Sequence, residues 1–140
     1  MLRVVLDYVA LTSALINPHG HAARVLDCAR QGRLRLFATR GMLETESRVL
    51  RHPLVRERLA MSDEELSDFT ADLPALTCLV VESATSETTR SPEAELLWCA
   101  KEGHADVLAV SSPLPAGNDP PEGIQVIRVD QLCELVDRGA

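Results

Sequence analysis

The sequence predicts a single α/β domain with three layers, α/β/α, built on a mostly parallel sheet of about five strands. Short, nearly all-apolar segments rich in β-branched residues recur along the chain, as in strands buried on both faces. Segments with helical periodicity lie between them, which is the order of a parallel sheet with crossover helices. The 140 residues, 46% of them hydrophobic, suffice for one core and are too few for two ordinary domains. We therefore treat residues 1–140 as one domain.

The predicted strands are each four or five residues long and are bounded by Gly, Asp, Ser or Pro. They are Leu2–Leu6, Arg35–Ala38, Cys78–Val81, Val107–Val110 and Ile124–Ile127. Two irregular stretches remain, residues 82–90 and the Pro- and Gly-rich residues 112–123, which we expect to be a surface loop. That loop fits either a tolerated insertion or a lid over the carboxyl edge of the sheet.

The predicted helices are marked by apolar periodicity and by capping residues. Ser62 and Glu65 form a capping box, and Ser91 followed by Pro92 is typical of a helix start. Helices are predicted over residues 22–29, from about 63 to 73, from about 92 to 103 and from about 130 onward.

Composition excludes several classes of protein. A formal charge of −7 argues against a uniformly basic nucleic-acid binder, and 3% aromatic residues leave little for base stacking. The chain has no apolar run long enough to cross a membrane, and Asp7 comes too early for a signal peptide, so we expect a soluble cytoplasmic protein. The four cysteines are far apart and lack the paired spacing of a zinc site, which indicates reduced core thiols.

The negative charge is unevenly distributed. Residues 24–58 hold nine arginines and four acids, a local charge of +5 within a chain of −7. Phosphate binding depends on local potential, so a polarised domain with one basic side remains compatible with RNA.

Several acids fall where the predicted strands end. Asp7 follows the first strand, Glu44 and Glu46 lie in the segment after the second, and Glu93 and Glu95 open the helix before the fourth. Parallel sheets form ligand sites at the carboxyl ends of their strands, and Mg²⁺ and Mn²⁺ prefer carboxylate oxygens. Acids meeting at this edge would hold such an ion, whose bound water attacks a phosphate.

Each of these acids also has a structural interpretation. Acids in the first turn of a helix complement its dipole, which is the favoured role of Glu93 and Glu95 on spacing alone. Asp7 follows a buried strand, where a carboxylate needs a partner, and it fits a site residue and a helix N-cap equally well.

The order of these pieces resembles the PIN domain family, in particular its bacterial branch of toxin components of type II toxin–antitoxin systems. The similarity spans Val4–Leu15, Leu34–Phe37, Met42–Pro53, Arg90–Ala100, Ala105–Ser112 and Gly123–Val136. It implies a metal-dependent ribonuclease that uses Mg²⁺ or Mn²⁺, cleaves single-stranded RNA, forms a homodimer and is held in check by an antitoxin. The catalytic and metal-binding residues it implies are Asp7, Glu44 and Glu93, with Glu46, Glu95 and Ser112 as weaker candidates.

The chain departs from the family pattern at most of its acidic positions. Val9 replaces the Asn that follows the first acid, Thr45 stands where the family has Glu, and Ser112 stands at the fourth acid. Only Asp7 is unchanged, and Glu93 is one methylene longer than the usual Asp. Two hypotheses follow: a metal-dependent ribonuclease of the toxin type, and a catalytically silent PIN-like module that binds RNA or a protein partner. The replacements favour weak or absent nuclease activity.

Overall fold

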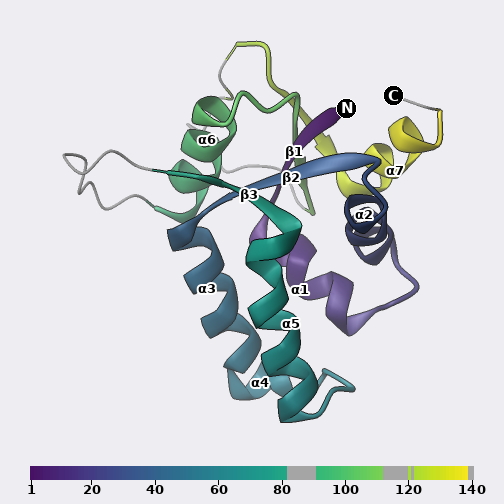
Figure 1. Cartoon of the computed structure of the whole chain (residues 1–140), viewed down its shortest axis with the longest axis vertical. Helices are drawn as coiled ribbons and strands as arrows, with labels where there is room; N and C mark the ends of the chain where they lie inside the picture. Colours follow the sequence, from purple (N-terminus) through teal and green to yellow (C-terminus); the bar gives the residue numbers. More distant parts are fainter. Residues whose placement is uncertain (82–90, 112–119, 121, 139–140) are drawn as a thin grey trace.

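Figure 1 shows a computed structural model of the chain, which describes residues 1–81, 91–111, 120 and 122–138. The irregular stretch 82–90, most of the loop predicted over 112–123 and the candidate Ser112 lie outside the described residues.

The described residues form one five-stranded sheet in which all neighbouring strands are parallel. The strand order is β3-β2-β1-β4-β5. The strands are β1 Leu2–Leu6, β2 Leu34–Thr39, β3 Thr77–Val80, β4 Val107–Val110 and β5 Gln125–Arg128. The helices are α1 Tyr8–Ile16, α2 His21–Arg30, α3 Arg40–Arg51, α4 Pro53–Arg56, α5 Asp63–Leu76, α6 Pro92–Glu102 and α7 Val129–Asp137. The predicted α/β class with a parallel sheet is confirmed.

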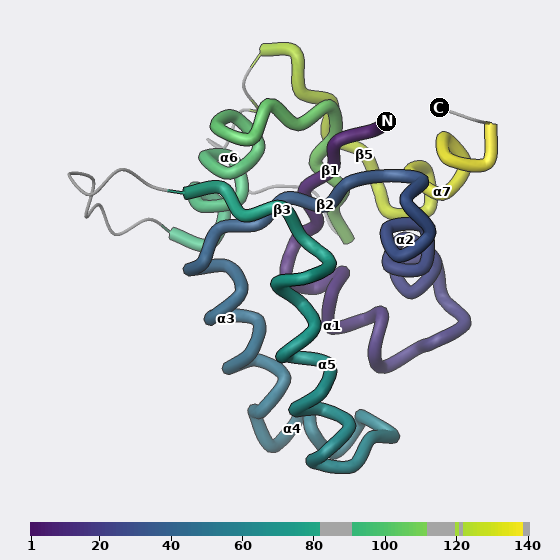
Figure 2. The backbone as a smooth tube through the Cα atoms, in the orientation of Figure 1, coloured from purple at the N-terminus to yellow at the C-terminus, as the bar shows by residue number. Residues whose placement is uncertain are grey.

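Strand side chains alternate between two hydrophobic cores, one on each face of the sheet. The sheet and the helices packed on its two faces therefore form three layers. Val5 and Leu108 pack with α6 on one face of the sheet. Val4 and Val107 pack on the opposite face with α1, α2, α3, α5 and α7. Figures 1 and 2 show α6 on one side of the strands, with α3 and α5 running away from the other side. Because both faces are covered, the strands read as continuous apolar runs in the sequence.

The capping residues identified in the sequence mark the helix starts. Ser62 accepts a hydrogen bond from the Glu65 amide at 3.1 Å, and the Glu65 carboxylate accepts one from the Ser62 amide at 3.1 Å. The helix that begins there continues to Leu76, three residues beyond the prediction, because Pro74 removes only one amide donor while Leu73 stays packed in the core.

Removal of this cap gives a first testable prediction. Ser62→Ala is expected to lower the free energy of unfolding by about 1 kcal/mol, because the Glu65 amide loses its acceptor. Urea unfolding followed by circular dichroism measures this. Ser67→Ala, an exposed serine later on the same helix, is the matched control and is expected to change it by less than about 0.5 kcal/mol.

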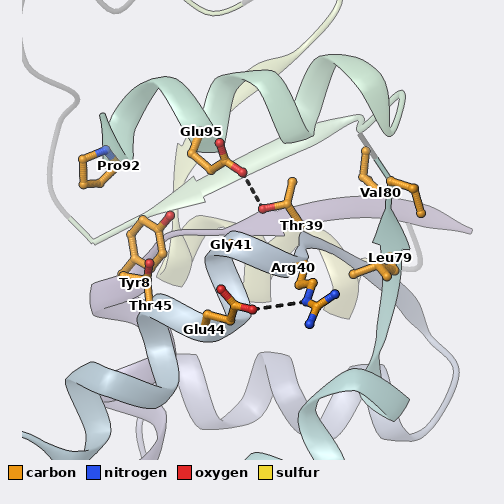
Figure 3. A pocket seen from close by; sticks show the side chains of 11 residues that line it. Tyr8, Thr39, Arg40, Gly41, Glu44, Thr45, Leu79, Val80, Pro92 and Glu95 are labelled. Atoms are coloured by element: carbon orange, nitrogen blue, oxygen red, sulfur yellow. Dashed lines mark hydrogen bonds and ion pairs between the residues drawn. The ribbon is translucent and has the colours of Figure 1, made fainter. Parts of the chain in front are cut away.

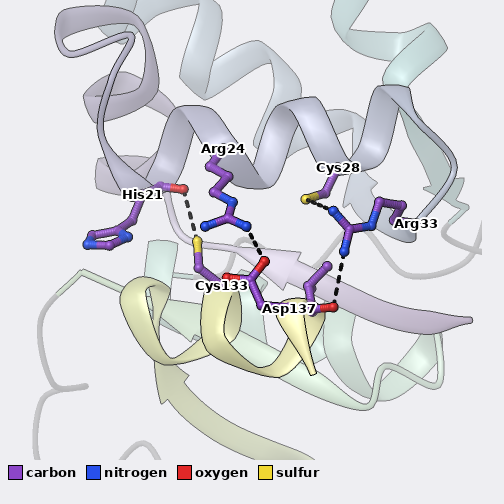
Figure 4. Close-up of polar contacts among 7 residues, drawn as sticks. His21, Arg24, Cys28, Arg33, Cys133 and Asp137 are labelled. Carbon is purple, nitrogen blue, oxygen red and sulfur yellow. Dashed lines mark hydrogen bonds and ion pairs between the residues drawn. The ribbon is translucent and has the colours of Figure 1, made fainter. Parts of the chain in front are cut away.

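The last helix is held against α2 by polar contacts (Figure 4). The Cys133 thiol donates to the His21 carbonyl at 3.3 Å, and the Arg33 guanidinium donates to the Val136 carbonyl at 3.2 Å. Arg24 and Asp137 form an ion pair between the two helices. These contacts hold α7 and α2 together on one face of the sheet.

Candidate active site

Asp7 leaves β1 at the carboxyl edge of the sheet and caps α1. Its Oδ1 accepts a hydrogen bond from the Ala10 amide at 2.8 Å, as an N-cap does. Its Oδ2 accepts one from the Ser111 amide at 2.8 Å, directly after β4, and the Ser111 hydroxyl lies 3.4 Å from Oδ1. The side chain is buried, with 8% of the residue exposed. The carboxylate therefore ties the start of α1 to the end of β4.

The candidates Glu44 and Glu46 and the intervening Thr45 point in different directions from α3, since neighbours on a helix are about 100° apart. Glu44 is exposed and pairs with the Arg40 guanidinium at 3.1 Å. Thr45, at the position of the family's Glu, lines a pocket. Glu46 is fully buried and accepts a hydrogen bond from the Thr12 hydroxyl of α1 at 2.9 Å.

The environment of Glu46 makes it hard to ionise. Burial raises the pKa of Glu46 to about 7, the nearby negative charge of Asp7 adds to the increase, and the Thr12 hydrogen bond opposes it. Its Oε2 is buried and has no hydrogen-bond partner among the described residues. Glu46 is therefore only partly ionised near neutral pH.

A pocket of about 580 Å³ opens beside these residues, between the starts of α3 and α6 and the end of β3 (Figure 3). Glu95 of α6 lines it and accepts a hydrogen bond from the Thr39 hydroxyl at 2.6 Å. Glu93 does not line it, although its charge is felt by Tyr8. The residues lining the pocket are Tyr8, Thr39, Arg40, Gly41, Glu44, Thr45, Leu79, Val80, Val81, Pro92 and Glu95.

Two pocket residues, Tyr8 and Thr39, were missed by sequence reasoning. Burial raises the pKa of Tyr8 to about 12, with contributions from the charges of Glu95, Cys99, Glu46 and Glu93, so its hydroxyl stays protonated and can donate a hydrogen bond. Thr39 caps α3 through the Met42 amide at 3.1 Å. A threonine at the end of an apolar strand, before a helix, is a signal that could have found Thr39; nothing local marks Tyr8.

The double role of Thr39 gives a second testable prediction. Thr39→Val is expected to lower the free energy of unfolding by about 1–2 kcal/mol, because both the cap of α3 and the hydrogen bond to Glu95 are lost. Thermal unfolding measures the change. Thr70→Val on α5, whose hydroxyl bonds only to the Ser67 carbonyl, is the control; a loss as large as that of Thr39→Val would contradict the assignment.

The carboxylates do not assemble into the ion site that the resemblance implies. Within the described part of the chain, no group of three or more His, Cys, Asp or Glu side chains could hold a metal ion. Asp7 is committed to two backbone amides, Glu44 is paired with Arg40, and Glu95 is bonded to Thr39. The described donor set therefore does not fit a divalent cation held by three carboxylates.

These features define an α/β protein with a parallel sheet and with separate acidic side chains near the carboxyl ends of its strands. The PIN domain family model matches residues 3–110 of the chain. The chain belongs to the PIN domain family. No curated protein and no solved structure shows a significant match to it. No helix among the described residues is long and apolar enough to cross a membrane.

Proposed function

We propose that this chain is a divergent PIN-domain protein of the toxin type in which metal-dependent RNA cleavage is weak or lost, and which acts as a binding module. The observation that carries the proposal is the state of Asp7. Both of its carboxylate oxygens are used by backbone amides, from Ala10 and from Ser111. The first acid of the family pattern thus supports the fold.

The rest of the acidic set supports the same conclusion. Thr45 offers a neutral hydroxyl where the family has a carboxylate, and the Glu44 carboxylate, which also lines the pocket, is paired with the Arg40 guanidinium. Glu46 is the α3 acid whose pKa feels the charge of Asp7, and the increase in that pKa leaves Glu46 partly neutral near pH 7. Asp7 and Glu46 alone would supply far fewer oxygen ligands than the octahedral set that a divalent cation needs. We therefore expect the affinity of the chain for Mg²⁺ or Mn²⁺ to be poor in the absence of substrate.

A cleavage assay tests the proposal. Fluorescently labelled single-stranded RNA is incubated with wild type and Asp7→Asn in millimolar Mn²⁺ or Mg²⁺. We expect the same slow background cleavage from both proteins, because Asp7 does not belong to a group of three possible ligands among the described residues. Mn²⁺-dependent cleavage by wild type that disappears in Asp7→Asn would overturn the proposal.

A residual metal-dependent ribonuclease is the second candidate, and one observation favours it. The buried Oε2 of Glu46 lacks a hydrogen-bond partner among the described residues and lies close enough to Asp7 for their charges to interact. Such an atom is where an ion or water would be accepted. This candidate uses Asp7, Glu46 and Glu93, with Mg²⁺ or Mn²⁺ as cofactor.

The same assay distinguishes Glu46 from Glu44 as the catalytic acid of α3. A residual nuclease loses its Mn²⁺-dependent cleavage in Glu46→Gln and keeps it in Glu44→Gln, which changes an exposed acid two residues away. The toxin-type branch also implies a homodimer, an antitoxin and single-stranded RNA as partners. These belong to the proposal and are tested by light scattering for the homodimer, by co-purification for a partner protein and by RNA-binding titration for single-stranded RNA.

A further inference from the structure

Strand β3 lies at one end of the sheet. It pairs with β2 on one side and with no other described strand. Figures 1 and 2 show β3 as the outermost strand, on the side where α5 runs away from the sheet. Among the described residues, no backbone hydrogen bond from outside the sheet reaches residues 78–81. The outer side of β3 therefore presents backbone donors and acceptors that a further strand can use.

The same edge is apolar and uncharged. Residues 77–81, which we call the β3 edge, contain no charged residue and no proline. Leu79 is 54% exposed, and Val81, directly after the strand, is 76% exposed. Charges and prolines are the usual means by which a soluble protein keeps an edge strand from pairing with another chain. The β3 edge has neither, so it is open to a partner strand.

The opposite edge of the sheet differs. Strand β5 carries the exposed residues Gln125 and Arg128, and the Arg128 guanidinium pairs with Asp130 at 3.2 Å. A charged side chain at a strand end discourages pairing with another chain. Of the two edges that the structure describes, the β3 edge is therefore the one suited to strand addition.

We propose that the β3 edge pairs with the β3 edge of a second copy of this chain, antiparallel and about a two-fold axis at Leu79. The two sheets then form one continuous sheet. The inference rests on the proposed function and deepens it, because it names the surface that forms the homodimer. In this register Thr77 lies opposite Val81 of the second copy, and Cys78 lies opposite its Val80. Opposite side chains then share a face of the sheet, as the period of two requires.

The chemistry of the edge favours a second copy over other occupants. A two-fold axis brings each residue close to its own counterpart, which is unfavourable for charged side chains and acceptable for an uncharged strand. Pairing also removes Leu79 and Val81 of both copies from water. RNA would find no cation on this strand to contact its phosphates. An extended peptide of another protein would find no charge there to select it.

The pairing also affects the candidate active site. Leu79, Val80 and Val81 line one side of the pocket of about 580 Å³ (Figure 3). A strand added outside β3 therefore borders this pocket, and each copy contributes to the surroundings of the other copy's pocket. The strand has four residues, few against the roughly 20–30 residues a side of a standard interface, so we expect a dissociation constant in the micromolar range.

Sedimentation equilibrium of the full chain at protomer concentrations from about 5 to about 500 µM tests the proposal. Wild type is expected to change from monomer to dimer over this range. Leu79→Lys and Leu79→Glu are each expected to weaken dimerisation at least about tenfold, because the apolar pair is lost and like charges meet at the axis. An equimolar mixture of the two variants is expected to restore the dimer. Gln125→Lys, at the exposed β5 edge, is the control and dimerises as wild type does.

Amide hydrogen exchange of wild type locates the interface without any substitution. Exchange in residues 78–81 is expected to slow as the protein concentration rises, while exchange in β5 stays constant. A wild type that remains monomeric, a dimer that Leu79→Lys leaves unchanged, or a mixture of the two charge variants that remains monomeric would each overturn the proposal. The cleavage assay does not depend on these results, so the proposed loss of nuclease activity and the β3 pairing can fail separately.

Discussion

Replacing Glu46 by Gln is expected to raise the free energy of unfolding at about pH 8 by roughly 3 kcal/mol. The pKa of Glu46 rises from 4.5 to about 7 in the folded chain, mainly through burial. The neutral acid therefore contributes stability fully below about pH 4.5, and this contribution is lost as pH rises through about 7, where the buried carboxylate must ionise. Glutamine keeps the shape and the hydrogen bond from Thr12 without ionising.

Urea unfolding at about pH 5 and about pH 8 measures this difference. Wild type should lose more stability between the two values than Glu46→Gln does, and the two proteins should differ little at the lower pH. Glu44→Gln is the control, because Glu44 is exposed on the same helix. Equal pH dependence in wild type and Glu46→Gln would show that Glu46 is not buried as a titrating group.

Asp7→Ala is expected to lower the free energy of unfolding by about 2–4 kcal/mol, because the buried Asp7 carboxylate accepts two charge-assisted hydrogen bonds, from the Ala10 and Ser111 amides, and both are lost. Asp7→Asn should destabilise less. The carboxamide oxygen of the introduced asparagine can still accept the hydrogen bond from the Ala10 backbone amide. Its NH₂ group, however, is a donor at the place where the Ser111 amide needs an acceptor. The same urea experiment measures both variants.

The sign of the Asp7→Asn effect distinguishes a structural carboxylate from a metal-site one. In an unoccupied metal site, neutralising one of several mutually repelling carboxylates raises stability. Asp7→Asn loses the hydrogen bond from the Ser111 amide and relieves the repulsion between Asp7 and Glu46. We expect the lost hydrogen bond to matter more, because Asp7 contributes less than burial does to the raised pKa of Glu46. Asp68→Ala, an exposed acid on α5, is the control; a rise in stability for Asp7→Asn would contradict the structural role.

Much of the fold could be predicted from local signals. The strand Leu2–Leu6 is apolar because both faces of the sheet are covered, and the helix at Asp63 begins where the Ser62 capping box places it. The orientation of the acids could not be read as directly, because it depends on how α3 rotates against its neighbours. Met42 and Leu50 lie four residues either side of Glu46 and are both buried, so they turn Glu46 inward with them.

The two interpretations of Asp7 could not be separated from sequence for a related reason. A carboxylate after a buried strand fits a cap and an ion site alike, and the Ser111 amide that donates to its second oxygen lies just after β4, more than a hundred residues away. The pocket beside Thr39 likewise requires α3, α6 and β3 to meet. Contacts of this range follow from the topology of the sheet, which local patterns do not specify.

The proposed loss of the metal site is tested most directly by thermal unfolding of wild type and Asp7→Asn in millimolar Mn²⁺ and in chelator. A bound ion stabilises the folded chain in proportion to its affinity. If Asp7 has the structural role proposed here, wild type should unfold at the same temperature with and without Mn²⁺. A rise of several degrees in wild type that is absent in Asp7→Asn would contradict it.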